Sequence, residues 1–143
     1  MLENGLVELS YRSVSSNDIG TLGLMRLSES SYRWNVAHQL TSVLFYENGH
    51  FGQLLEGGRS AVEELWGRIQ KDPRHREIHL LGIRPITARR FPNSPLRLYD
   101  GKVFAAGIPE LKVKLIDNIS ALDVELEKVK VALGFGENTA SSA

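Results

Sequence analysis

Cysteine is absent from the 143-residue chain, so disulfide bonds, thiolate metal sites and cysteine nucleophiles are excluded. A net charge is absent as well, because 17 basic residues balance 17 acidic ones. A neutral protein has no global field that would draw it to nucleic acid or to anionic lipid. We therefore expect small molecules or other proteins as partners, and no nucleic acid.

Long apolar runs are missing too. No stretch approaches the ~20 apolar residues that a membrane-crossing helix needs, and the N-terminus has neither the basic nor the apolar region of a signal peptide. The sequence therefore predicts a cytoplasmic protein that is not bound to a membrane. It also predicts no metal site, because His38, His50 and His79 lack a metal-ligand spacing.

The first strand is predicted from alternation. Over residues 6–13, apolar residues and Tyr11 share one face, and polar residues occupy the other. This period of two is typical of a half-buried strand. A helix is expected from residue 18 to about residue 35, with Ser16 or Asn17 as its N-terminal cap.

A hairpin comes next in the sequence. Residues 40–47 and 50–56 have the composition of strands, and Asn48-Gly49 lies between them. Both turn residues tolerate a positive φ, so they favour a two-residue hairpin turn.

The second helix is predicted from its start and stop signals. Ser60 and Glu63 have the spacing of a capping box, and Asp72-Pro73 ends the helical pattern. A fourth strand is expected over residues 77–87.

The predicted order of elements is therefore βαββαβ. Right-handed crossovers arrange such a chain as an α+β, ferredoxin-like sheet with both helices on one face. The first and third strands then lie side by side, and Tyr11 and Gln53 become neighbours.

The ferredoxin-like domain is expected to span residues 1–99. Residues 92–98 contain two prolines, and they are expected to form a loop or a short fifth strand. Residues 100–143 form a C-terminal helical extension and tail, in which an amphipathic helix is predicted from about residue 120 to residue 133.

Two polar residues stand at inward-facing strand positions, Tyr11 and Gln53. Burying a phenol and a carboxamide is costly unless they bond each other or a third polar group. In the predicted fold they form the floor of a slot, with Leu24 and Leu27 on one wall and Ile69 on the other. Flat apolar walls with a few polar groups suit a planar heteroaromatic ligand.

Polar residues are also predicted at the edge of this slot. Ser31 and Asn35 continue the inward stripe of the first helix, and Arg68, Asp72 and Arg74 stand at the end of the second. An asparagine both donates and accepts hydrogen bonds. The mixture of groups therefore fits an imide or uracil-like edge of a ring.

Taken in order, these residues resemble the BLUF domain, the FAD-binding blue-light sensor of bacteria. The resemblance covers about residues 5–99. It rests on Tyr11, Asn35, the phrase from Asn48 to Gly57, Asp72-Pro73-Arg74-His75 and Arg89-Arg90-Phe91-Pro92.

The resemblance implies a photoreceptor that binds FAD, with FMN or riboflavin as other candidates. Tyr11 would be the electron and proton donor, and Gln53 would bridge it to the flavin. The implied cofactor-binding residues are Tyr11, Leu27, Ser31, Asn35, Gln53, Arg68, Ile69, Asp72, Arg74 and His75. Such a protein is not an enzyme, and we expect it to signal to a separate downstream protein or through a change of homo-oligomer.

The chain departs from the family pattern at several positions, and Leu40-Thr41-Ser42 stands where most members have Ile-Thr-Gly. Ser42 thus takes the place of the glycine, and Ser94 and Leu96 replace a usual tryptophan and methionine. The last two positions are associated in the family with relaying the flavin state to the output surface. Without the tryptophan, we expect no competing electron donor near the flavin beside Tyr11.

Three other functions share the predicted fold. An acylphosphatase-like hydrolase would need a glycine-rich phosphate cradle with an arginine after the first strand, but residues 13–17 read Ser-Val-Ser-Ser-Asn. An RNA-binding RRM domain needs interleaved aromatics on its third strand, where this chain offers only Phe51. A colourless interaction module that has kept the fold without the flavin remains the third alternative.

Overall fold

The computed structural model describes residues 5–16, 19–99, 114–115 and 124–135. The elements are β1 (Leu6–Ser15), α1 (Gly20–His38), β2 (Thr41–Glu47), β3 (His50–Gly58), α2 (Arg59–Lys71), β4 (His75–Pro85), β5 (Arg97–Tyr99), β6 (Lys114–Leu115) and α4 (Val124–Ala132). No helix within these described ranges is long and apolar enough to cross a membrane.

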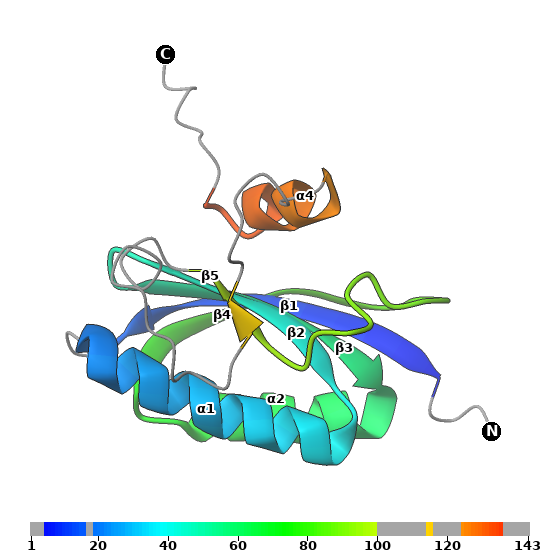
Figure 1. Ribbon diagram of the computed structural model, residues 1–143, viewed down its shortest axis with the longest axis horizontal. Helices are drawn as coiled ribbons and strands as arrows, with labels where there is room; N and C mark the ends of the chain where they lie inside the picture. Colours follow the sequence, from blue (N-terminus) through cyan, green and yellow to red (C-terminus); the bar gives the residue numbers. More distant parts are fainter. Residues whose placement is uncertain (1–4, 17–18, 100–113, 116–123, 136–143) are drawn as a thin grey trace.

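The strands form one sheet in the order β4-β1-β3-β2-β5-β6. The pairings among β4, β1, β3 and β2 are antiparallel, and β5 and β6 extend the sheet in parallel. Both α1 and α2 cover one face, whereas α4 lies on the other (Figure 1). The ferredoxin-like order and the neighbouring first and third strands are therefore confirmed, and a short fifth strand forms at 97–99.

The register of β1 on β3 places Tyr11 directly opposite Gln53. The hairpin that precedes this pairing has the predicted turn, since Asn48 and Gly49 have φ angles of 51° and 79°. These are the positive values that a two-residue turn between right-twisted strands requires. The position of Gln53 opposite Tyr11 therefore follows from a local turn and a period-two strand.

Both helices begin differently from the prediction. Helix α1 starts at Gly20 after Ile19, which makes no capping bond through its side chain, so a start at residue 18 is wrong. Helix α2 starts at Arg59 after Gly58, which places Ser60 inside the helix and not at its cap. The Arg59 N–H bonds the Gly5 carbonyl at 3.2 Å, so a contact with the chain before β1 satisfies the helix end.

Strand β4 also differs from its prediction. It begins two residues earlier, at His75, and it forms an edge of the sheet. Its apolar residues Leu80, Leu81 and Ile83 are 47%, 47% and 39% exposed. An edge strand has a neighbour on one side only, so its side chains receive less cover.

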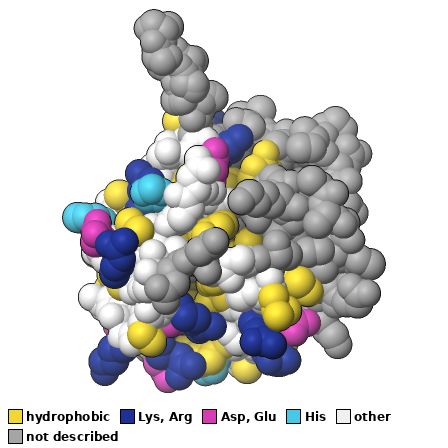
Figure 2. All heavy atoms as spheres, turned by 90° about the vertical axis from the view of Figure 1, so that its left-hand side faces the viewer, with side chains coloured by type: hydrophobic (Ala, Val, Ile, Leu, Met, Phe, Trp, Pro, Cys, Tyr) yellow, Lys and Arg dark blue, Asp and Glu magenta, His cyan; other side chains and the backbone are white. Residues whose placement is uncertain are grey.

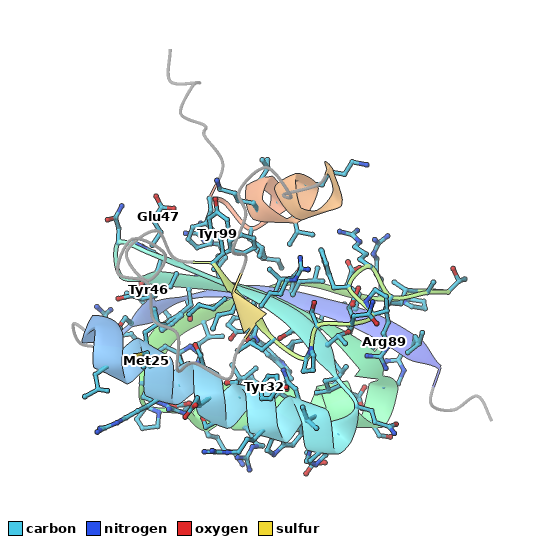
Figure 3. All side chains as sticks on the ribbon, viewed as in Figure 1. Met25, Tyr32, Tyr46, Glu47, Arg89 and Tyr99 are labelled. Carbon is cyan, nitrogen blue, oxygen red and sulfur yellow. The ribbon has the colours of Figure 1, made fainter. Side chains whose placement is uncertain are left out.

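Two layers of core lie on opposite faces of the sheet. On the α1 side, Met25 and Tyr32 pack against buried leucines of the sheet (Figure 3). On the other side, Val129 and Leu133 of the predicted C-terminal helix pack with Phe45 of β2. The first predicted residues of that helix, 120–123, lie outside the described residues.

At Gly52, strand β3 approaches the C-terminal segment closely. A Cβ atom added there would lie 2.5 Å from Phe135 Cε2 and 3.3 Å from Leu133 Cβ. Gly52 precedes Gln53 on β3, and side chains alternate between faces along a strand. The strand that presents Gln53 to one layer is thus in direct contact with the C-terminal segment in the other.

We expect Gly52→Ala to destabilise the fold by about 1–3 kcal/mol, because the added methyl group overpacks the contact with Phe135. Gly67→Ala is the matched control, since nothing lies within 4 Å of the added Cβ. That change in a helix should stabilise by about 0.5–1 kcal/mol. Urea unfolding of both variants measures the difference, and equal stability would contradict the packing described.

Candidate functional site

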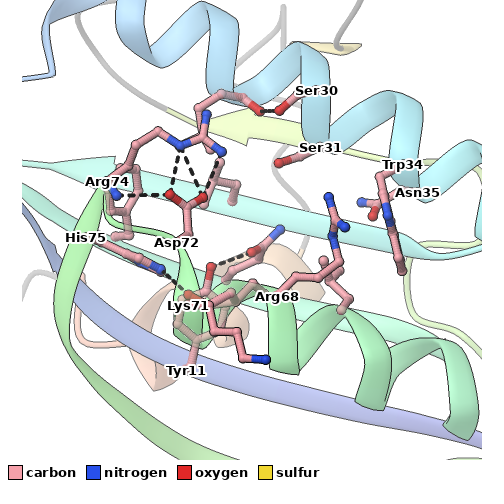
Figure 4. A pocket seen from close by; sticks show the side chains of 16 residues that line it. Tyr11, Ser30, Ser31, Trp34, Asn35, Arg68, Lys71, Asp72, Arg74 and His75 are labelled. Atoms are coloured by element: carbon pink, nitrogen blue, oxygen red, sulfur yellow. Dashed lines mark hydrogen bonds and ion pairs between the residues drawn. The ribbon is translucent and has the colours of Figure 1, made fainter.

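A cavity of about 380 Å³ lies between α1, α2 and the sheet. Its volume falls in the range typical of small-molecule sites. All ten residues of the predicted set line it, namely Tyr11, Leu27, Ser31, Asn35, Gln53, Arg68, Ile69, Asp72, Arg74 and His75. Figure 4 shows Ser31 and Asn35 of α1 and Arg68 of α2 on two sides of one space.

The floor of the cavity holds a short hydrogen bond. The Tyr11 hydroxyl donates to Gln53 Oε1 at 2.6 Å, and the two residues are 4% and 5% exposed. A phenol can donate to the oxygen of a carboxamide or accept from its NH2 group, and here the oxygen end of Gln53 faces Tyr11. The predicted pairing of the two buried polar groups is confirmed.

The other end of Gln53 joins a polar network. Gln53 Nε2 donates to Ser42 Oγ at 3.4 Å, and Ser42 Oγ donates to the Pro95 carbonyl at 3.1 Å. Asn35 Nδ2 donates to the same hydroxyl at 3.2 Å and to the same carbonyl at 2.8 Å. The sequence indicated Ser42 only as a departure from a family pattern, and it carried no signal for the Pro95 carbonyl.

Asn35 leaves one atom without a partner. Its Oδ1 is buried and accepts no hydrogen bond from the described residues. A buried carbonyl oxygen without a donor costs about 1–3 kcal/mol, so it indicates a group that arrives with a ligand. Any N–H or O–H donor would complement this oxygen, and the imide N–H of a flavin is such a donor.

Burial raises the pKa of the Tyr11 phenol well above its ordinary value, and the charge of Asp72 raises that pKa further. The neutral phenol is therefore the form present at physiological pH. A neutral phenol keeps the proton that it donates to Gln53, so the hydrogen bond across the cavity floor persists.

Asp72 and Arg74 form a clamp at the end of α2. Arg74 Nε donates to Asp72 Oδ1 at 3.0 Å, its Nη2 donates to Oδ2 at 2.7 Å, and its backbone N–H donates to Oδ1 at 2.9 Å. Burial raises the pKa of the Asp72 carboxyl, but these bonds from Arg74 outweigh it and hold the pKa below its ordinary value. Asp72 is thus a fixed negative charge near Tyr11.

His75 ties three elements together beside the phenol. Its Nε2 donates to the Ile69 carbonyl at 2.8 Å, and its Nδ1 is paired with Ser13 Oγ at 2.7 Å. Its ring lies edge-on to the ring of Tyr11, with centroids 6.1 Å apart. The residue therefore positions the wall of the cavity and is not a surface group.

Two cationic side chains of α2 and one tryptophan of α1 also line the cavity. Arg68 lies over the ring of Trp34, with its Cζ 5.3 Å from the ring centroid, and Lys71 lines the same cavity. Figure 2 shows basic side chains gathered over the lower part of the molecule, where α1 and α2 lie. Neither Lys71 nor Trp34 was predicted, because helix periodicity alone does not separate the flank of a stripe from its centre.

Two expectations about the site are wrong. Leu24 is not a wall of the cavity; it is 1% exposed and packs in the core with Leu44 and Leu96. A tryptophan is present near the site despite Ser94, since Trp34 lines the cavity and the ring of Trp66 lies 5.5 Å from that of Tyr11.

The chain matches a known protein family. The model of "Sensors of blue-light using FAD", the BLUF family, matches residues 6–97. This is most of the described part of the chain, and it includes the whole cavity. The chain belongs to the BLUF family of blue-light photoreceptors.

Individual relatives agree with this membership. The chain is 33% identical over 88 residues to the photoactivated adenylate cyclase subunit beta of Euglena gracilis, covering 62% of this chain and 10% of the cyclase. It is 33% identical over 95 residues to the blue light- and temperature-regulated antirepressor BluF of Escherichia coli, covering 66% and 24%. The chain thus spans between a tenth and a quarter of these relatives.

A solved structure matches nearly the whole chain. The dark-state structure of BlrB, a BLUF protein, is 31% identical and matches with a TM-score of 0.69 over 99% of each chain. The flavin of the family fits the residues present here, because the buried Asn35 Oδ1 has no donor among the residues that the structure describes, and the Gln53 carboxamide lines the same cavity.

The raised pKa of Tyr11 predicts a pH dependence of stability. The unfolded chain loses the phenol proton near pH 10, whereas the folded chain keeps it, so folding weakens as the pH rises above about 10. Above about pH 10, the free energy of unfolding should fall with pH more steeply in the unmodified protein than in Tyr11→Phe. The difference in slope should be up to about 1.4 kcal/mol per pH unit. Urea titrations between pH 8 and pH 11 measure this, and parallel curves for the two proteins would contradict it.

Proposed function

We propose that the chain binds FAD between α1 and α2 and converts blue light into a rearrangement of the Gln53 hydrogen bonds. The observation that supports this most directly is the buried bond from Tyr11 to Gln53 on the floor of the cavity. This bond joins a phenol that can be oxidised to a carboxamide that can turn around, and both line the cavity proposed to hold the flavin ring.

The bound flavin supplies light absorption and, once excited, a strong oxidant. Tyr11 then gives up an electron and passes its hydroxyl proton along the 2.6 Å bond to Gln53. Return of the electron and proton to Tyr11 leaves the Gln53 side chain rotated or tautomerised. The residues end in their original redox state with a different pattern of donors and acceptors.

A carboxamide suits this role because its two ends differ. Oε1 accepts hydrogen bonds and Nε2 donates them, so turning the group reverses the polarity that it presents to Tyr11 and to the ring. One exchanged hydrogen bond contributes about 1 kcal/mol, whereas a nearly complete shift of populations needs about 5.5 kcal/mol. The output therefore includes repacking of strands or helices.

The remaining lining residues hold the ring. In this proposal Leu27 and Ile69 sandwich it, Asn35 accepts its N–H, and the clamp of Asp72 and Arg74 lines its polar side with His75 and Ser31. Among the cations that line the cavity, Arg74 pairs with Asp72, whereas Arg68 and Lys71 have no carboxylate partner among the described residues. They suit the phosphates of FAD, which riboflavin lacks.

The output is proposed to be a contact and not a turnover reaction. The relatives include a photoactivated adenylate cyclase subunit and a light-regulated antirepressor, so members of the family act on different partners. We propose that this chain signals in the cytoplasm to a separate downstream protein or through a change of homo-oligomer.

Tyr11→Phe and Gln53→Ala should both bind flavin and lose the light-induced red shift of its absorption band. The first lacks the donor hydroxyl and the second lacks the group that rearranges. Absorption spectra before and after blue illumination measure the shift. Tyr32→Phe is the control, because Tyr32 packs in the α1 core and does not line the cavity; an unchanged shift in Gln53→Ala would reject the mechanism.

Replacing Arg68 and Lys71 tests whether the cavity prefers FAD to riboflavin. We expect Arg68→Ala/Lys71→Ala to weaken FAD binding roughly tenfold, as two lost charge contacts would, and to leave riboflavin binding unchanged. Arg59→Ala is the matched control, since Arg59 lies on the same helix and pairs with Glu63 at 3.4 Å, outside the cavity. Equal losses for both flavins, measured by titration of the flavin-free protein, would exclude a phosphate contact.

A further inference from the structure

Ser42 lies where the Gln53 side chain meets the segment that leads into β5. It is completely buried, and its hydroxyl is within hydrogen-bond distance of Gln53, Asn35 and the Pro95 carbonyl. Its backbone N–H donates to the Ser94 carbonyl at 3.0 Å. One residue thus contacts the light-sensitive amide and the segment in which the usual tryptophan and methionine are replaced.

A count of hydrogens shows how the contacts are ordered. Asn35 Nδ2 has two hydrogens, and they go to Ser42 Oγ and to the Pro95 carbonyl. Gln53 Nε2 uses one hydrogen on Ser42 Oγ. The hydroxyl of Ser42 therefore accepts two bonds, and its only hydrogen goes to the Pro95 carbonyl at 3.1 Å.

Reorienting the carboxamide removes this order. When the two ends of Gln53 exchange places, Oε1 and not Nε2 faces the Ser42 hydroxyl. Two oxygens then stand at hydrogen-bond distance with no hydrogen between them, which is unfavourable in a buried site. The nearest hydrogen that can move is that of the Ser42 hydroxyl, which rotates freely about its C–O bond.

We propose that Ser42 is a positioning residue that relays the orientation of Gln53 to the Pro95 carbonyl. In the dark its hydroxyl donates to Pro95, and in the light it turns and donates to Gln53. The Pro95 carbonyl then keeps only the bond from Asn35. This inference rests on the proposed light-driven rearrangement of Gln53, and it names the next residue that responds.

The relay ends next to β5, which pairs with β2, the strand that carries Ser42. Val43 pairs with Arg97 across β2 and β5, and Leu96 is fully buried in the core with Leu44. A bond lost at Pro95 therefore acts on the residue that precedes this buried leucine. The Ser42 hydroxyl links Gln53 to Pro95 at a point where a glycine would offer only its backbone N–H.

The test is a light-minus-dark infrared difference spectrum of the flavin-loaded protein carrying proline labelled with ¹³C at the carbonyl. The chain has five prolines, and Pro95→Ala identifies the band of Pro95. We expect this band to shift to higher frequency in the light, because the carbonyl loses one of its two donors. Ser42→Ala and Ser42→Gly should abolish the shift while the flavin red shift persists.

Ser28→Ala is the matched control. Ser28 is also fully buried, and its hydroxyl makes no hydrogen bond with the described residues, so the labelled band should still shift in this variant. The lit state should also decay about fivefold faster in Ser42→Ala but not in Ser28→Ala, because the variant lacks the bond from Ser42 to Gln53 that must break before the amide turns back.

The outcomes separate the two proposals. A protein that shows no red shift at all would overturn the proposed function. A red shift accompanied by an unmoved Pro95 band, or by the same band shift in Ser42→Ala, would overturn the relay and leave the function intact.

Discussion

The hydrogen bond between Tyr11 and Gln53 is the contact on which the rest of the site depends. Two polar side chains can share the buried floor of a cavity only if they bond each other or a third polar group, and Tyr11 and Gln53 bond each other at 2.6 Å. The pairing requires β1 and β3 to be antiparallel neighbours in one particular register. A slip of one residue would turn one of the two side chains to the other face of the sheet.

Strand β3 connects this contact with both faces of the sheet. Gln53 faces the cavity, whereas Gly52 and Leu54 on either side of it face the layer that contains α4. On the neighbouring strand β2, Ser42 extends the polar network from Gln53 to the Pro95 carbonyl. A change in the orientation of one amide can therefore reach the entry to β5 through hydrogen bonds and the α4 layer through packing.

Local patterns accounted for much of this arrangement. The period of two placed Tyr11 and Gln53 on inward faces, and Asn48-Gly49 determined the hairpin, because both depend only on neighbours in the sequence. The start of α2 was not predictable in this way, since the Gly5 carbonyl satisfies the Arg59 N–H. Whether an inward leucine such as Leu24 meets a ligand or the core likewise depends on packing, which periodicity does not contain.

The most direct measurement is a difference absorption spectrum of the purified, flavin-loaded protein, recorded before and after blue light and then followed in darkness. We expect a red shift of the flavin band that reverses completely in the dark, because the amide changes its hydrogen bonds and the flavin keeps its redox state. A spectrum that does not change, or one that bleaches to a reduced flavin without a red-shifted form, would contradict a switch built on Tyr11 and Gln53.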